Sequence, residues 1–124
     1  MSLQIATILD RAAEIVEPPG AWSRDYVRDA AGRGVVNTLD PRAASFGMVD
    51  AIKLAVWQIC GVESRCDIKI GRHPLVVETL RFVIEQIPNE GLLWNYSSGR
   101  RQDEVVAKIR QLSRAAAQDA RAAG

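Results

Sequence analysis

The chain has 124 residues, of which 48% are hydrophobic and 25% charged, as is typical of a globular domain and not of a disordered or fibrous protein. Sixteen basic and fifteen acidic side chains give a formal net charge of +1, so no global field predicts binding to nucleic acid or to a membrane. We expect a single domain over residues 1–124. Residues 117–124 lack large apolar side chains, and we expect this end to fray.

The first half of the chain opens with a clear helical pattern. Apolar residues at helical spacing predict a helix over residues 3–16, capped by Ser2 and ended by the run Pro18-Pro19-Gly20. Residues 17–39 have no helical period, and we expect Trp22 and Tyr26 to anchor them to the core. Residues 26–28 and 33–36 flank the turn-like stretch 29–32, a pattern that favours a short hairpin.

Asp40 followed by Pro41 is typical of a helix start, because aspartate accepts from free N–H groups and proline at the first helical position has none. We expect the second helix to run from there to about Cys60. Its wide apolar face predicts the buried centre of a bundle. Asp50 and Lys53 fall on its polar arc and interrupt the apolar run, so it does not predict a membrane span.

The remaining elements complete a mainly α fold. Residues 61–73 predict a loop with a short strand over 67–70, where apolar and charged residues alternate. A third helix is expected from Pro74 to about Ile87, and a fourth from about Gln102. The fold class is therefore a single-domain, four-helix orthogonal or bundle-like array with room for a small β-hairpin. The residues expected to be buried together are Phe46, Val49, Ile52, Val56, Leu80, Val83, Ile84, Ile109 and Leu112.

The segment from Leu93 to Arg101 is the strongest candidate for a binding site. It places aromatic residues, a glycine turn and two arginines at the start of the fourth helix, where free N–H groups and the positive dipole end attract an anion. Trp22 joins this set, because amphipathic aromatic residues in loops suit recognition. The alternative is that both tryptophans only pin their loops to the bundle. The candidate anion- or partner-binding residues are Trp22, Trp94, Asn95, Tyr96, Gly99, Arg100 and Arg101.

No metal site or cofactor is predicted. Cys60, Cys66 and His73 have the spacings C-x5-C and C-x6-H, which match no common zinc pattern and lack a fourth ligand. Cys60 ends an apolar helix, where a thiol usually acts as a small core residue. Because no secretory signal opens the chain, we expect a cytoplasmic protein with free thiols. Catalytic residues stay unknown, since no catalytic motif stands in the sequence.

Four motifs together resemble a known family. They are Glu17 to Trp22, Arg28 to Gly32, Asp40 to Ala43, and Trp94-Asn95 with Gly99-Arg100 and Glu104-Val105. Their order and spacing, from about Leu9 to Ala116, are similar to those of a domain-of-unknown-function family of small bacterial and phage proteins. The resemblance implies no activity.

The chain also departs from the pattern of that family. It has Gly47 and Asp50 where the family tends to have cysteine and glycine. It has Arg101 where the family usually has a threonine cap, so the fourth helix lacks a hydroxyl cap unless Ser97 or Ser98 supplies one.

These observations favour a small cytoplasmic binding or interaction module, related to phages or mobile elements, whose partner is another protein or a second copy of the chain. One alternative is a small enzyme with a carboxylate- or arginine-based site between the Trp22 and Trp94 loops. Another is a nucleic-acid accessory protein that uses Arg100, Arg101, Lys108, Arg110 and Arg114. A pocket with shifted carboxylates, salt-sensitive binding or an exposed apolar patch distinguishes the three classes.

Overall fold

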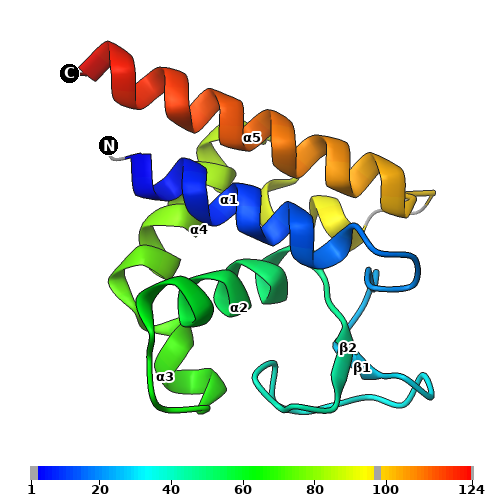
Figure 1. The fold of residues 1–124 in the computed structure, drawn as a ribbon. Coiled ribbons are helices and arrows are strands. Elements are labelled where there is room, and N and C mark those ends of the chain that lie inside the picture. Colours follow the sequence, from blue (N-terminus) through cyan, green and yellow to red (C-terminus); the bar gives the residue numbers. More distant parts are fainter. Residues whose placement is uncertain (1–2, 97–98, 124) are drawn as a thin grey trace.

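The computed structural model describes residues 3–96 and 99–123, and within them the chain is mainly helical with one small sheet. Helix α1 (Leu3–Val16) and helix α5 (Gln102–Ala123) lie side by side and run in opposite directions (Figure 1). Helix α2 (Met48–Cys60) and helix α4 (Pro74–Gln86) pack against α1 from its other side. The four expected helices are therefore present. None of the described helices combines the length and apolar character needed to cross a bilayer.

Helices α1 and α5 meet through apolar side chains at helical spacing. On α1 the buried set includes Ile5, Leu9 and Val16, and on α5 the predicted seam of Val105, Ile109, Leu112 and Ala116 is buried throughout. The hydroxyl of Ser113, also buried, donates to the carbonyl of Ala6 at 2.8 Å, so no polar group is stranded at this contact. Because α1 contacts α2, α4 and α5, it shares the centre of the fold with α2, which was expected to be the centre alone.

The expected start of the second helix is wrong. Residues Ala43–Ser45 form strand β2, which pairs antiparallel with β1 (Arg28–Asp29), and α2 begins only at Met48. The carboxylate of Asp40 accepts instead from the backbone N–H and the guanidinium of Arg42, at 2.9 and 2.8 Å, and closes a turn. Because the Asp40 carboxylate is bonded to Arg42 within this turn, it does not cap a helix here.

The predicted hairpin is present around residues 27–35. The N–H of Val35 donates to the carbonyl of Val27 at 2.8 Å, and Asp29 accepts from the N–H groups of the turn that follows it. Tyr26 does not anchor this segment, because it is 53% exposed. Its ring covers Gly34, where a Cβ would lie 2.9 Å from Tyr26 Cε2.

Two segments that were expected to be a strand and a loop are short helices. Residues Asp67–Gly71 form helix α3, not a strand, with Ile70 as its buried residue. Ile68 and Ile70 are two residues apart and lie on different sides of a helical turn, so Ile70 is buried while Ile68 is 66% exposed. The sheet found among the described residues is the pair β1 and β2 elsewhere in the chain. The segment Gly91–Tyr96 forms the 3-10 helix η1.

The core prediction holds for most of its members. Phe46, Ile52, Val56, Val83, Ile109 and Leu112 are buried in one cluster. Val49 and Leu80 are only half-buried, and Ile84 is 47% exposed. On α4 the buried residues are Val76, Thr79, Phe82 and Val83, so this apolar helix turns a different side to α1 than its sequence indicated. Helix α5 continues to Ala123, and fraying of residues 117–124, of which Gly124 lies outside the described residues, stays a prediction.

Candidate functional site

Asn95 links three parts of the chain that are distant in sequence. Its side chain is 1% exposed, and its Oδ1 accepts from Trp22 Nε1 at 2.8 Å and from the N–H of Met48 at 3.3 Å. Its Nδ2 donates to the carbonyls of Ser23 and Arg24, at 3.3 and 3.2 Å. Both acceptor positions and both amide protons of the side chain are therefore used. Asn95 caps α2 from a distance, a role that local sequence patterns do not indicate.

This contact fills the space between the Trp22 and Trp94 loops, in which one alternative placed an enzyme site. The groove beside Trp22 opens elsewhere, over β1 and β2, with a volume of about 470 Å³. Two carboxylates, Asp25 and Asp29, line it. The Arg28 guanidinium, 2.9 Å away, lowers the pKa of Asp25 to about 2, and backbone N–H donation from Arg33 lowers the pKa of Asp29. Carboxylates with lowered pKa values are poor general bases at neutral pH.

Trp94 is the centre of the predicted binding segment and is nearly buried. The guanidinium of Arg100 lies 4.1 Å from the centroid of its ring, and Lys108 Nζ lies 5.9 Å from it. Arg100 Nε also donates to the Trp94 carbonyl at 3.2 Å. This stacking fixes the loop before α5 on the indole, because the ring face attracts a cation.

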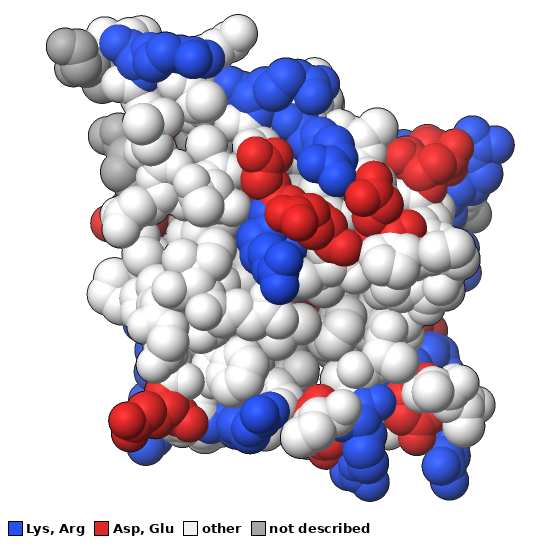
Figure 2. Space-filling view, viewed as in Figure 1, with Lys and Arg blue, Asp and Glu red and all other residues white. Residues whose placement is uncertain are grey.

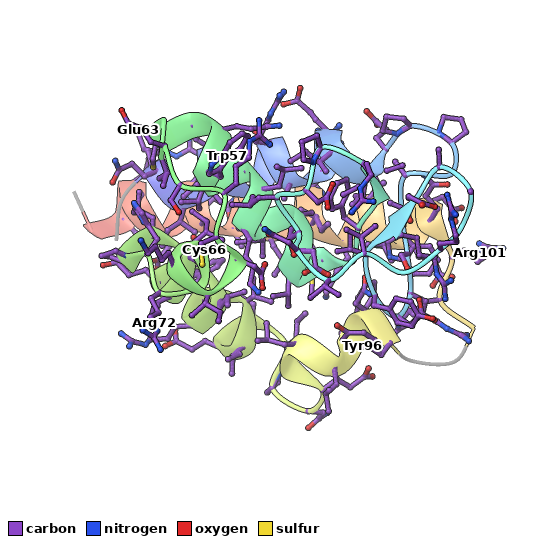
Figure 3. The ribbon with its side chains drawn as sticks, turned by 90° about the horizontal axis from the view of Figure 1, so that it is seen from below. Trp57, Glu63, Cys66, Arg72, Tyr96 and Arg101 are labelled. Atoms are coloured by element: carbon purple, nitrogen blue, oxygen red, sulfur yellow. The ribbon has the colours of Figure 1, made fainter. Side chains whose placement is uncertain are left out.

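Both arginines of the predicted site face carboxylates of the chain itself. Arg100 lies 3.4 Å from Glu90 and 4.0 Å from Glu104, and Arg101 lies 3.4 Å from Asp103 and from Glu104. The first turn of α5 carries Asp103 and Glu104, and the positive end of the helix dipole stabilises both negative charges. Arg101 is 73% exposed by side chain and lies at the edge of the molecule (Figure 3). Gly99 adopts a positive φ of 84°, as its turn requires, and Ser97 and Ser98 lie outside the described residues.

Figure 3 shows Tyr96, the last residue of η1, well apart from Arg101. Partial burial, followed by the charges of Asp50 and Asp25, raises its pKa. Asp50 was expected on a solvated arc but is half-buried, and its Oδ1 accepts from the hydroxyl of Thr38 at 2.9 Å. Burial raises the pKa of Asp50. Asp50 lines neither the groove beside Trp22 nor the two grooves along α5.

A groove of about 460 Å³ runs beside Trp94 along the first half of α5. Its lining residues are Trp94, Glu104, Ala107, Lys108, Gln111 and Arg114. Lys108 Nζ reaches the side-chain oxygen of Gln111 at 3.4 Å. Neither Lys108 nor Arg114 belongs to an ion pair found among residues 3–96 and 99–123, in contrast to Arg100 and Arg101. The groove therefore carries two cations that the described part of the chain does not neutralise.

A second groove lies on the other side of Ala107. It has a volume of about 480 Å³, an apolar floor of Pro19, Val106 and Ala107, and polar side chains at its edge. Arg110 at this edge is held by Glu17, 3.2 Å away. Gln102 Nε2 lies 2.8 Å from the carbonyl of Val16 and 2.6 Å from that of Pro18, so it satisfies the end of α1. The helical periodicity of α5 does not indicate this pair of grooves, and the small Ala107 between them is the one local signal.

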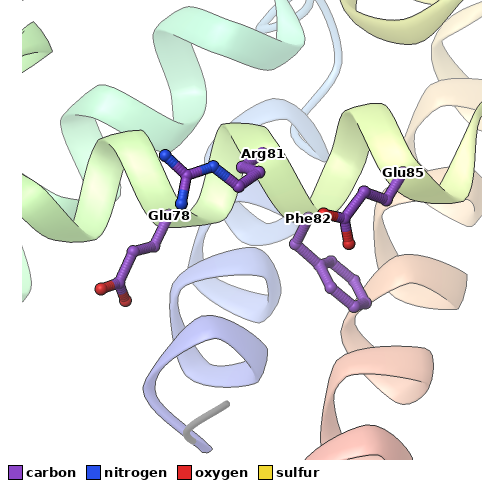
Figure 4. A pocket seen from close by; sticks show the side chains of 4 residues that line it. All are labelled: Glu78, Arg81, Phe82 and Glu85. Atoms are coloured by element: carbon purple, nitrogen blue, oxygen red, sulfur yellow. The ribbon is translucent and has the colours of Figure 1, made fainter.

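A third hollow lies on α4 alone, with a volume of about 230 Å³ and a lining of Glu78, Arg81, Phe82 and Glu85 (Figure 4). Since all four residues come from one helix, a ligand there would contact a single wall. It is a weaker candidate than the grooves beside α5, which collect residues from two segments.

The cysteines and the histidine do not come together. Cys60 is exposed, contrary to its expected place in the core, and Cys66 is half-buried. His73 Nδ1 accepts from the N–H of Leu75 at 3.1 Å and caps α4. Among the residues that the structure describes, no group of three or more histidine, cysteine or acidic side chains is arranged to hold a metal ion.

Comparison with known proteins gives one match. Residues 1–118 match the model of a family of unknown function, DUF6197. No curated protein and no solved structure matches the chain.

Proposed function

The chain belongs to this family of unknown function, and from that premise we propose that it is a small non-catalytic interaction module that binds an acidic segment of a partner protein along the first half of α5. The supporting observation is the groove beside Trp94, where Lys108 and Arg114 carry charge that no ion pair of the described chain neutralises. The cytoplasmic location and the relation to phages or mobile elements stay predictions.

The chemistry of the two grooves defines the ligand. The Trp94 groove offers the indole and two cations without an ion pair, and its one carboxylate, Glu104, faces Arg100 and Arg101, so the groove suits an acidic ligand. The groove across Ala107 offers an apolar floor of Pro19 and Val106, so it suits an apolar side chain. Ala107 is small, which lets the backbone of a partner approach α5 closely. An amphipathic helix with acidic residues on one flank and an apolar residue on the other fits both grooves together.

The same charges argue against a nucleic-acid ligand. Of the five basic residues that this alternative requires, three already face acidic side chains of the chain itself. Arg100 faces Glu90 and Glu104, Arg101 faces Asp103 and Glu104, and Arg110 faces Glu17. A phosphate backbone is bound through many released counterions, and two available cations support few such contacts. Arg100 fixes the loop on Trp94 in this proposal, and Lys108 and Arg114 contact the ligand.

Fluorescence anisotropy with labelled peptides tests the proposal. The probes are an amphipathic helical peptide of glutamate and leucine, the same peptide with glutamine in place of glutamate, and a single-stranded oligonucleotide. The double variant Lys108→Glu, Arg114→Glu is expected to weaken binding of the acidic peptide by at least about tenfold. The matched control, Lys69→Glu, Arg72→Glu, makes the same change in net charge at exposed positions of and beside α3 and should bind within about twofold of the wild type.

Three outcomes contradict the proposal. They are equal losses in both double variants, equal binding of the glutamate and glutamine peptides, and tighter binding of the oligonucleotide than of the acidic peptide. The last would favour the nucleic-acid alternative.

A further inference from the structure

The exposed side of α4 carries charges that the fold leaves without a partner. Glu78 and Glu85, which we call the acidic pair, are exposed and belong to no ion pair in the described part of the chain, although Arg81 lies between them in sequence. Figure 4 shows the three side chains spread along the helix. Val77 and Ile84, the apolar pair, directly precede the two acids and are 41% and 47% exposed. Helices that lie in a groove of a partner have apolar anchors at this spacing of seven residues.

The acidic pair of α4 matches the free cations of α5 in spacing and is opposite in sign. Lys108 and Arg114, the basic pair, line the groove beside Trp94 and are six residues apart, or about 9 Å along the helix axis. The acidic pair is seven residues apart, or about 10.5 Å. Figure 2 shows basic side chains gathered over the middle and the end of α5, so an acidic helix face is attracted to this helix.

The order of the side chains around each helix fixes the direction of the pairing. On α4 each acid follows an apolar residue by one position, and on α5 Lys108 follows Val106 and Ala107 of the apolar groove. Two helices with the same order around their axes bring corresponding side chains face to face when they run antiparallel. The acidic pair then meets the basic pair, and the apolar pair meets the groove across Ala107. Arg81 comes opposite Gln111, which is uncharged, so no like charges meet.

We propose that the acidic segment bound along α5 is α4 of a second copy of this chain. This inference rests on the function proposed above and identifies its partner. Within one copy, no ion pair joins α4 to α5 in the described part of the chain, so both pairs of charges stay available. A contact between two copies neutralises these charges and covers the apolar pair. Because two different surfaces meet, copies add head to tail.

Exchange of charge between the two helices tests the proposal, by sedimentation equilibrium of the full chain at concentrations up to about 1 mM. The wild type is expected to associate, with a weight-average mass that rises with concentration. The double variants Lys108→Glu, Arg114→Glu and Glu78→Lys, Glu85→Lys should each weaken self-association by at least about tenfold, since each places like charges opposite one another. An equimolar mixture of the two double variants should associate again, because opposite charges then meet at both kinds of contact.

The matched control is Asp10→Lys, Glu63→Lys. It makes the same change in net charge as the lysine variant of the acidic pair, at exposed acids of α1 and of the loop after α2, and should associate within about twofold of the wild type. If far-UV circular dichroism shows that the lysine variant of the acidic pair is unfolded, Glu78→Gln, Glu85→Gln takes its place and should weaken association by at least about threefold.

A wild type that is monomeric at every concentration overturns the proposal. So do double variants that associate like the wild type, a control that loses as much as they do, or a mixture that stays dissociated. Anisotropy with the glutamate and leucine peptide on Glu78→Gln, Glu85→Gln separates this result from the function proposed above, because that variant keeps Lys108 and Arg114. Peptide binding by a chain that does not self-associate contradicts the pairing of copies alone, whereas absence of peptide binding to this variant contradicts the proposed function.

Discussion

The layer of α1, α2 and α5 and the irregular segment 20–47 are stabilised by different forces. In the layer, Ile5, Leu9, Ile52 and Ile109 each have 0% exposure, and helices contact one another through many such side chains. The segment adds Val27, Leu39 and Phe46 to the core, and between them its backbone and polar side chains are held by individual hydrogen bonds. Trp22 donates to Asn95, Ser23 donates to the carbonyl of Tyr26 at 2.7 Å, and Asp29 accepts from its own turn.

The two regions should therefore respond differently to substitution. Apolar burial is non-directional and its free energy is spread over many contacts, so a single loss lowers the stability of the whole domain. A buried hydrogen bond is directional, and removing one partner leaves the other group unsatisfied at one place. The predictions below test this difference, from the largest expected effect to the smallest.

Ile52→Ala should lower the free energy of unfolding by about 2–5 kcal/mol, because it opens a cavity at a fully buried position of α2. Leu80→Ala removes the same kind of side chain from a half-buried position of α4, and we expect a loss of about 1–2 kcal/mol. Urea denaturation measures both. Equal losses would mean that α4 is packed as tightly at Leu80 as α2 is at Ile52.

Asn95→Leu should cost about 1–3 kcal/mol, because leucine has a similar size but leaves the N–H of Met48 and the indole N–H of Trp22 without their acceptor. Amide hydrogen exchange should accelerate in residues 20–47 and at the start of α2, while α1 and α5 keep their protection. The control is Asn89→Leu in the exposed turn after α4, which should leave exchange unchanged. Uniform acceleration over all helices would show that the segment does not unfold separately.

The smallest effect concerns Asp50, where α2 meets the segment through Thr38. Burial raises the pKa of Asp50, so the folded state binds this proton more tightly than the unfolded state, and the ionised carboxylate lowers stability at neutral pH. Asp50→Asn keeps an acceptor for Thr38 and should raise the Tm at pH 7, by less than Ile52→Ala lowers it.

This gain should disappear as the pH falls through the folded-state pKa of Asp50, because the wild-type carboxyl is then neutral as well. Thermal melts between about pH 7 and pH 4 measure the difference, a window that spans ordinary and raised aspartate pKa values. The control is Asp10→Asn on the exposed side of α1, which removes the same formal charge. A lower Tm of Asp50→Asn at pH 7 would show that Lys53 and the helix dipole outweigh the burial of the carboxylate.

The resemblance to a family of unknown function came from motifs in the chain, and the model of such a family covers residues 1–118. The residues of the candidate site were expected in part, and their role in binding stays a prediction. Trp94 and Arg100 do lie together, but Lys108 and Arg114 were considered only as part of a nucleic-acid surface. Their arrangement around the indole depends on how α5 is rotated against α1. No pattern within a single helix specifies that rotation.

The sequence by itself determined α1, α4 and the start of α5. Apolar residues at a spacing of three to four located these helices, Pro18 marked the end of α1, and Pro74 and the turn at 88–91 marked the two ends of α4. Those signals are local, because they depend on side chains within a few residues of one another. Only the tertiary structure decided where α2 begins and which sides of α4 and α1 stay exposed. The cap of α2 comes from Asn95, 47 residues later. Contacts between distant parts of the chain have no periodic signature, since their geometry is set by packing.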